Sequence, residues 1–433
     1  MLKKIFLHIL LLVCYQYFGW TQETIYPAKK QEGTLVIKNG TVHTGTGTVL
    51  KNAHIVVKDG KIVTVSQSAV DEVGATVIDA TGKNVYPGLI LTSSDLGLKE
   101  ISSGVRGSND YYELGQYNSA IQSIYAYNAD SRMINTLRAN GVLLAGVTPS
   151  GSLLTGASSV VQLDAWTWQD ALYASATGMH LHMPSLYRSM RGGRTSASGS
   201  NPVKEGIKLV EQVEQFLAEA QAYIKQHPKP DVNLKFEMLR PLFEKKQKLF
   251  VHADRVRQIL MAIDFAKKFD IEVVIIGGAD SYLVADLLKK NNISVVLNTL
   301  HELPTLPDDD IDQPFKTPAI LQRAGVLFAL NDNSSSARYR NLAFNAGTAV
   351  AYGLTKEQAL QAITLNPAKI LGIDKQAGSI EVGKDANIVI CEGDILDMKS
   401  SIITNAFIQG RKIDLSNKQT QLYERYKYRY NLQ

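Results

Sequence analysis

Short apolar runs alternate with helix-like stretches through the middle of this 433-residue chain. The runs are rich in β-branched residues and apolar throughout, as expected of strands buried on both faces of a parallel sheet. From Leu249 onward one strand and one helix recur roughly every 22–30 residues, a spacing that favours a closed barrel over an open sheet. The predicted strands span 142–147, 249–252, 272–276, 294–297 and 326–330, with helices at 255–269 and 281–290.

The stretch from Gly97 to Lys204 follows this alternation less well. It contains a Gly-, Ser- and Arg-rich segment at 189–200, which we predict to be a mobile loop over one face of the barrel. Because the chain is too long for one average domain, a barrel with a smaller companion accounts for its length.

Two regions with the pattern of short antiparallel strands flank the predicted barrel. From Thr34 to Asp79, short β-type runs are separated by turns such as Asn39-Gly40, the strongest short-range hairpin signal. Similar runs return after Gly378, and each region needs the other to complete a sheet. The last segment, 415–433, is rich in Lys, Arg and Tyr and fits either a surface helix or a disordered tail.

The N-terminus has the pattern of a secretory signal. Lys3 and Lys4 precede an apolar run that ends at Phe18, and small residues lead to a predicted cleavage after Thr21. The run is short for a bilayer span, which needs about 20 residues, although a retained anchor is the alternative. We therefore expect residues 1–21 to direct export to the periplasm or the extracellular space. Removal of this segment leaves Cys391 alone, so no internal disulfide is expected.

Charge and motifs exclude several classes of function. The formal net charge is only +5, and no block of Lys and Arg interleaved with aromatic residues was found, so we expect no nucleic-acid partner. No Gly-x-Ser-x-Gly motif occurs, which argues against a serine hydrolase of the α/β type.

Three segments resemble amidohydrolases related to imidazolonepropionase: Val85-Tyr86-Pro87-Gly88-Leu89-Ile90, Ala359-Leu360-Gln361-Ala362-Ile363-Thr364-Leu365-Asn366-Pro367-Ala368-Lys369-Ile370-Leu371-Gly372 and Gly378-Ser379-Ile380-Glu381-Val382-Gly383-Lys384-Asp385-Ala386-Asn387-Ile388-Val389-Ile390. They correspond to the first turn into the barrel, the final helix and the return strands of that family. The resemblance implies an α/β fold with a (β/α)8 TIM-like barrel at 87–372. It also implies a small composite β-sandwich domain built from 34–86 and 376–414.

The resemblance also shows what is missing. Active relatives carry His-x-His after the Pro-Gly, where alternate residues on one strand bind a divalent metal together. The corresponding segment here, 91–97, contains no histidine, and none lies near Gly277-Gly278, where the sixth strand of relatives supplies one. The family pattern does match His252 at the fifth strand, as a metal ligand, and Asp332 at the eighth, as the general base.

Other residues extend this candidate site. His180 and His182 are two apart at the end of a predicted fourth strand, so they share one face, and with His252 and Asp332 they are expected to form a three- or four-ligand metal site. His301 and Arg338 are candidates for substrate binding, the latter through its guanidinium fork. The competing interpretations are a core or surface histidine for His252, an Asx turn for Asp332 and a solvated arginine for Arg338.

Two functions remain open at this point. One is a hydrolase that uses a reduced zinc site on the C–N bond of a small amide or dipeptide-like substrate. The other is a catalytically inactive member without a metal, which binds a ligand or pairs with an active amidohydrolase relative. Relatives commonly form oligomers, so a homo-oligomer is a further expectation.

Overall fold

The computed structural model describes residues 25–100, 112–186, 201–226, 231–298, 300–302, 309–332 and 336–432. The predicted signal peptide and the predicted loop at 189–200 lie outside the described residues. Within the described ranges, no helix is both long and apolar enough to cross a membrane.

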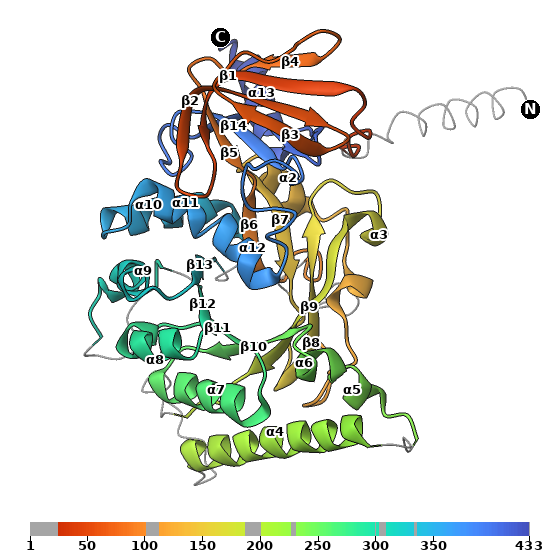
Figure 1. Ribbon diagram of the computed structural model, residues 1–433, viewed down its shortest axis with the longest axis vertical. Coiled ribbons are helices and arrows are strands. Elements are labelled where there is room, and N and C mark those ends of the chain that lie inside the picture. Colours follow the sequence, from red (N-terminus) through yellow and green to blue (C-terminus); the bar gives the residue numbers. More distant parts are fainter. Residues whose placement is uncertain are drawn as a thin grey trace, which may run out of the picture.

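The described strands form two sheets, and the sheet of the larger domain is a nearly closed barrel (Figure 1). Its strand order follows the chain from β6 to β13, and the predicted fifth and sixth strands are β10 and β11. The barrel strands are β6 (Leu89–Ser94), β7 (Val142–Val147), β8 (Leu154–Gln162), β9 (Leu172–His182), β10 (Lys248–Ala253), β11 (Val273–Gly277), β12 (Ser294–Leu297) and β13 (Phe328–Leu330).

The side chain of Asn331 bridges the gap between the first and last barrel strands. Its Oδ1 accepts hydrogen bonds from the N–H groups of Thr92 and Ser93 at 3.1 and 3.3 Å, and its Nδ2 donates to the Ser93 carbonyl at 2.9 Å. Asn331 is fully buried, so these bonds satisfy backbone groups that water does not reach. The barrel predicted from the strand spacing is confirmed.

The third barrel strand departs from a regular (β/α)8 pattern. β8 runs antiparallel to both β7 and β9, and only the four-residue helix α3 (Trp168–Ala171) lies between β8 and β9. Consecutive antiparallel strands need no crossover helix. This explains why the stretch from Gly97 to Lys204 lacks a regular alternation in the sequence.

Helices cover the outside of the barrel from β9 onward (Figure 1). Helix α7, for example, buries Ile259, Ile263 and Phe265 on one side. The described helices around the barrel are η1 (Ser123–Ala126), α2 (Arg132–Arg138), α4 (Pro202–Lys225), α5 (Leu234–Glu237), α6 (Arg240–Phe243), α7 (Val256–Phe269), η2 (Ser281–Val284), α8 (Ala285–Lys290), α9 (Gln313–Ala324), η3 (Ser336–Asn341), α10 (Leu342–Ala351), α11 (Lys356–Gln361) and α12 (Leu365–Leu371).

The second sheet combines strands from both ends of the chain, as the flanking β regions predicted. β14 pairs with β5 in antiparallel register, so the two halves form one continuous mixed sheet. From β5 the chain passes through Pro87 and Gly88 directly into β6. Its strands are β1 (Thr34–His43), β2 (Val49–Lys58), β3 (Lys61–Ser66), β4 (Thr76–Asp79), β5 (Asn84–Pro87), β14 (Ile388–Glu392), β15 (Ile402–Ile408) and β16 (Arg411–Lys412).

The C-terminal segment ends in a helix, α13 (Lys418–Tyr430), which decides between the two alternatives left by the sequence. Its N-cap Asn417 accepts a hydrogen bond from the N–H of Thr420, and the Thr420 hydroxyl accepts one from the N–H of Asn417. Such reciprocal capping satisfies backbone groups that the first helical turn leaves unpaired.

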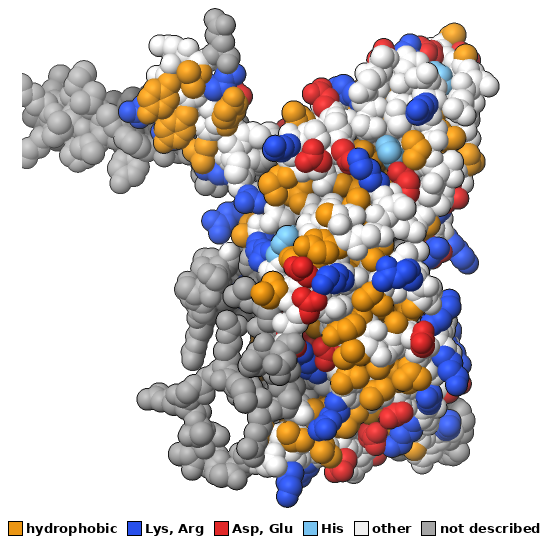
Figure 2. All heavy atoms as spheres, turned by 90° about the vertical axis from the view of Figure 1, so that its left-hand side faces the viewer, with side chains coloured by type: hydrophobic (Ala, Val, Ile, Leu, Met, Phe, Trp, Pro, Cys, Tyr) orange, Lys and Arg blue, Asp and Glu red, His pale blue; other side chains and the backbone are white. Residues whose placement is uncertain are grey.

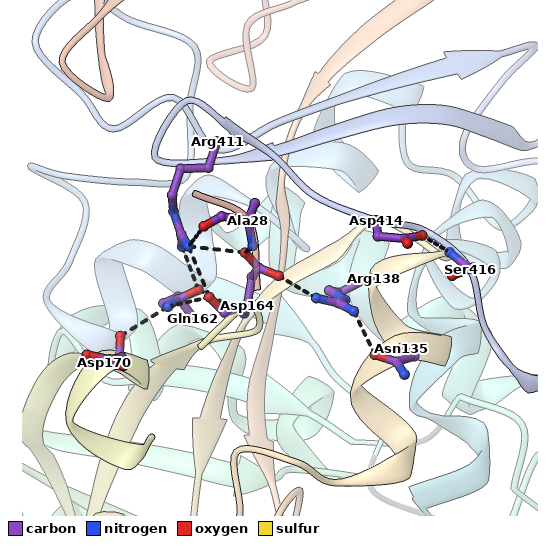
Figure 3. Close-up of polar contacts among 9 residues, drawn as sticks. All are labelled: Ala28, Asn135, Arg138, Gln162, Asp164, Asp170, Arg411, Asp414 and Ser416. Atoms are coloured by element: carbon purple, nitrogen blue, oxygen red, sulfur yellow. Dashed lines mark hydrogen bonds and ion pairs between the residues drawn. The ribbon is translucent and has the colours of Figure 1, made fainter. Parts of the chain in front are cut away.

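A buried ionic network joins the two domains and the N-terminal segment (Figure 3). Asp164 follows β8, and its carboxylate lies 2.5 Å from Nη1 of Arg138 in α2 and 3.1 Å from Nη1 of Arg411 in β16. The same carboxylate accepts a hydrogen bond from the N–H of Ala28 at 2.9 Å. Since the side chains of Asp164 and Arg138 are almost completely buried, the charges must balance one another.

We expect Asp164→Ala to lower the free energy of unfolding by about 3–5 kcal/mol, because it leaves the buried Arg138 guanidinium without a counter-charge. The midpoint of urea unfolding, followed by circular dichroism, measures this change. Glu244→Ala is the matched control, since its pair with Lys246 is exposed and its backbone has a negative φ, and it should leave the midpoint unchanged. Equal midpoints for both variants would show that the network does not stabilise the fold.

Candidate active site

Three histidines gather at the carboxyl ends of β9 and β10. The strand register places His182 opposite His252, and His180 opposite Phe250. His180 Nδ1 lies 3.0 Å from His252 Nε2, within hydrogen-bond distance, and the rings of His182 and His252 stack with centroids 3.9 Å apart. The ring of His180 also stacks on Phe250. The carboxyl ends of barrel strands are where active sites of this fold lie.

Burial keeps these histidines neutral. It lowers the pKa of His180 to about 3 and that of His182 to about 4, and it holds the pKa of His252 well below the ordinary value. Mutual repulsion between the imidazoles lowers the pKa values of His180 and His252 further. A neutral imidazole retains a ring nitrogen with a free lone pair, which is the form that binds a metal.

Two ring nitrogens of this group lack partners. The Nε2 atoms of His180 and His182 are buried and form no hydrogen bond with any described residue. Unsatisfied buried polar atoms are rare, and a bound ion is one explanation for them. Their donor chemistry therefore fits a divalent metal.

The geometry of the group does not yet form a complete metal shell. Among the described residues, no three or more His, Cys, Asp or Glu side chains are arranged to hold a metal ion. The hydrogen bond between His180 and His252 occupies one nitrogen of each ring, and it must break before His252 Nε2 can act as a ligand. The structure brings the predicted ligands together, while their metal-binding role stays a prediction.

Asp332, the predicted general base, lies just beyond β13 and is completely buried. Asn345 of α10 donates a hydrogen bond from Nδ2 to its Oδ2 at 3.0 Å. Arg338, a predicted substrate-binding residue, lies in η3 with its Nε 3.9 Å from the same oxygen. The carboxylate is thus held in one orientation by two elements that follow the last barrel strand.

His301, the other predicted substrate-binding residue, lies beside α9 and α10. Its Nε2 is 3.1 Å from the hydroxyl of Thr348, and its ring packs against Phe315. The side chain is exposed. These contacts account for its orientation, and a role in substrate binding remains a prediction.

The end of the first barrel strand carries hydroxyl groups. Ser93 Oγ lies 3.0 Å from Thr148 Oγ1, and Ser94 Oγ donates to the Gly146 carbonyl at 2.9 Å. Thr92 Oγ1 is buried and has no partner among the described residues. The following Asp95 accepts a hydrogen bond from Tyr339, whose pKa is raised by burial and by this carboxylate. Asp95 is therefore engaged by a tyrosine hydroxyl.

The sixth strand ends in two glycines that are closely approached by neighbouring side chains. Gly277 has a φ of +102°, and a Cβ at this position would lie 2.2 Å from Asp254 Oδ1. Gly278 also has a positive φ, and its Cβ would lie 2.7 Å from a Val295 methyl group. A side chain at either position would be strained by the positive φ and would require Asp254 or Val295 to shift, which gives the glycine pair a structural reason.

A pocket lies at the carboxyl ends of β10, β11 and β12, and none of the three histidines is among its lining residues. Sequence reasoning missed it, although Asp254 and Arg255 directly follow the strand end that carries His252. Burial and the nearby Glu302 raise the pKa of Asp254. The pocket is lined by Asp254, Arg255, Gly277, Ala279, Asp280, Tyr282, Leu297, Asn298, Leu300, Glu302, Asp309, Asp310, Gln313, Pro314 and Thr317.

Comparison with known proteins gives consistent matches. The profile of the Amidohydrolase family matches residues 320–413. An imidazolonepropionase from Picrophilus torridus is 29% identical over 177 residues, which cover 38% of this chain and 42% of that protein. An imidazolonepropionase from Flavobacterium psychrophilum is 29% identical over 157 residues, covering 32% and 38%. The chain thus spans less than half the length of these curated relatives.

A solved structure matches over a larger part of the chain. The crystal structure of an amidohydrolase from Thermotoga maritima MSB8 is 25% identical, with a TM-score of 0.76. The match covers 88% of this chain and 99% of that one, so it includes both the barrel and the composite sheet.

Gly277→Ala tests the packing at the sixth strand. Positive φ alone costs an alanine about 1–2 kcal/mol, and the contact with Asp254 adds to this cost. Gly74→Ala is the matched control, because Gly74 has a φ of +69° and no heavy atom within 4 Å of the point that a methyl group would occupy. We expect a lower urea midpoint for Gly277→Ala than for Gly74→Ala, with partial recovery in the Gly277→Ala/Asp254→Ala double variant. No recovery would mean that Asp254 is not the obstacle.

Stability should fall as the pH drops below about 6.5, the ordinary pKa of histidine. Between pH 6.5 and about 4 these histidines are protonated in the unfolded chain but remain neutral in the folded protein. Protonation therefore favours unfolding in this range. Thermal unfolding midpoints across this range measure the effect. His182→Gln, which removes one such group, should show a shallower fall than the unsubstituted chain. An unchanged slope would show that His182 is not held neutral.

Proposed function

Because the chain belongs to the amidohydrolase superfamily, we propose that it hydrolyses the C–N bond of a small amide or dipeptide-like molecule. The observation that carries the proposal is the group of neutral histidines at the carboxyl ends of β9 and β10, with two buried ring nitrogens unpaired. The pocket at the carboxyl ends of β10, β11 and β12, whose lining includes Asp254 two residues after His252, offers space for a small substrate. Export through residues 1–21 is part of the same proposal.

The histidines would hold a single zinc ion. His180 and His182 would supply their unpaired Nε2 atoms, and His252 would supply a third nitrogen once its bond to His180 is broken. Three protein ligands are typical of catalytic zinc, which lowers the pKa of a water molecule and polarises the scissile carbonyl. Asp332 would accept a proton as general base, with Asn345 fixing its carboxylate. Arg338 is close enough to steer a carboxylate-bearing substrate toward it.

A second candidate is a ligand-binding protein or a partner subunit of an active relative, without a metal. Two observations favour it. The hydrogen bond between His180 and His252 satisfies one nitrogen of each ring without any ion. The ends of the first and sixth strands offer hydroxyl groups and glycines, which do not match the ligands expected for a divalent metal of this family. The pocket at the carboxyl ends of β10, β11 and β12 would then be the ligand site.

Elemental analysis of the purified full-length chain separates these candidates. If the chain is a hydrolase, about one zinc per chain is expected, and both His182→Ala and His252→Ala should lose it. His54→Ala in β2 is the control and should retain the metal. Metal-free protein after incubation with zinc would reject the hydrolase mechanism and favour the second candidate. Metal binding that survives both substitutions would reject this ligand set.

A further inference from the structure

Helix α13 stands at the surface with no buried residue among its thirteen, as far as the described chain shows. A side-chain hydrogen bond ties it to the body of the protein, from Thr136 Oγ1 in α2 to Gln419 Oε1, at 3.4 Å. Isolated helices shorter than about 12–15 residues are marginal in water, so a helix of this kind normally depends on a packing partner. The composition of α13 indicates what that partner is.

One side of α13 carries a stripe of phenol rings. Residues three, four or seven apart lie on the same side of a helix, and Tyr423, Tyr426 and Tyr430 have this spacing. The rings of Tyr426 and Tyr430 stack with centroids 6.3 Å apart. The exposed fractions are 63%, 50% and 61% for the three tyrosines. We call this surface the tyrosine stripe; it consists of Leu422, Tyr423, Tyr426 and Tyr430.

Basic side chains flank the tyrosine stripe. The helix contains four of them, Lys418, Arg425, Lys427 and Arg429, and a single carboxylate, Glu424. Lys427 Nζ lies 5.7 Å from the centre of the Tyr423 ring, and the Arg429 guanidinium lies 5.6 Å from that of Tyr430. Figure 2 shows hydrophobic side chains with Lys and Arg around them on the projection at the upper left. In α13, Lys and Arg do alternate with aromatic residues, which the prediction that the sequence contains no such segment overlooked.

We propose that α13 is an interfacial helix that binds the surface of a bilayer containing anionic lipids. Tyrosine is favoured at the depth of the lipid headgroups, because its ring is apolar and its hydroxyl remains hydrated. Lysine and arginine beside it are attracted to anionic headgroups. A helix with low overall hydrophobicity, an aromatic side and basic flanks lies in the plane of the interface and does not span the membrane.

The stripe favours a bilayer over a nucleic acid or a second copy of the chain. Single-stranded nucleic acid is bound in a positively charged groove lined by stacking rings, whereas α13 is a single surface helix with no buried residue in the described chain. A second copy would bring four more basic side chains of the same helix into the contact if α13 paired with itself, which is repulsive. The surface of an anionic bilayer accommodates both the tyrosine stripe and the basic side chains of the helix. This role is independent of the hydrolytic activity proposed above.

Co-sedimentation of the protein with vesicles tests the proposal. We expect binding to vesicles of phosphatidylglycerol and phosphatidylcholine at low salt, and at least about tenfold weaker binding to phosphatidylcholine alone. Arg425→Glu/Arg429→Glu and Tyr426→Ser/Tyr430→Ser should each weaken binding to the anionic vesicles by about tenfold or more. Every variant is compared in the form from which residues 1–21 have been removed, because their apolar run would itself bind vesicles, so differences between variants report on α13.

Matched variants complete the test. Lys204→Glu/Lys208→Glu changes the charge equally on α4 and should bind like the unsubstituted chain, and Tyr426→Phe/Tyr430→Phe should keep its binding because the rings remain. An unchanged thermal midpoint shows that each variant is folded. Equal binding by all variants, or no preference for anionic vesicles, would overturn the proposal. The proposal would also be overturned if the α13 variants still bound vesicles but no longer bound an oligonucleotide or no longer formed dimers.

Discussion

The buried carboxylate of Asp164 holds the two domains in one arrangement. It follows the reversed strand β8 and meets a guanidinium from α2, a guanidinium from β16 and the N–H of Ala28. A charge in this environment is tolerated only when several partners neutralise and hydrogen-bond it. Because the partners come from the barrel, the composite sheet and the N-terminal segment, none can move without exposing the charge.

The reversal of β8 also shapes the candidate site. β8 and β9 form an antiparallel pair, and β9 is the longest of the barrel strands, with eleven residues. Its end therefore reaches the carboxyl end of β10, where His182 meets His252. Burying three imidazoles leaves polar nitrogens unsatisfied and keeps the rings neutral. Folded proteins usually avoid such features outside functional sites, which makes this strand end the best supported location for chemistry.

The histidine group and α13 suggest two separate tasks for one chain. The first is chemistry or ligand binding at the barrel mouth, where Asn345 and Arg338 orient Asp332 and a pocket opens beside β10. The second is attachment to an anionic surface through a helix at the opposite end of the molecule from α4 (Figure 1). An enzyme or binding protein held at a membrane surface would meet substrates or ligands that are produced there.

The sequence alone determined the fold class, because the period of the apolar runs and the Asn-Gly turns report which faces of the strands are buried. It also placed His252, His182 and Asp332 at strand ends, since those residues follow apolar runs directly. Only the tertiary structure decided the direction of β8, the bond between His180 and His252, and the close approach of Asp254 to Gly277. These depend on distances between residues far apart in the chain, which a one-dimensional pattern does not contain.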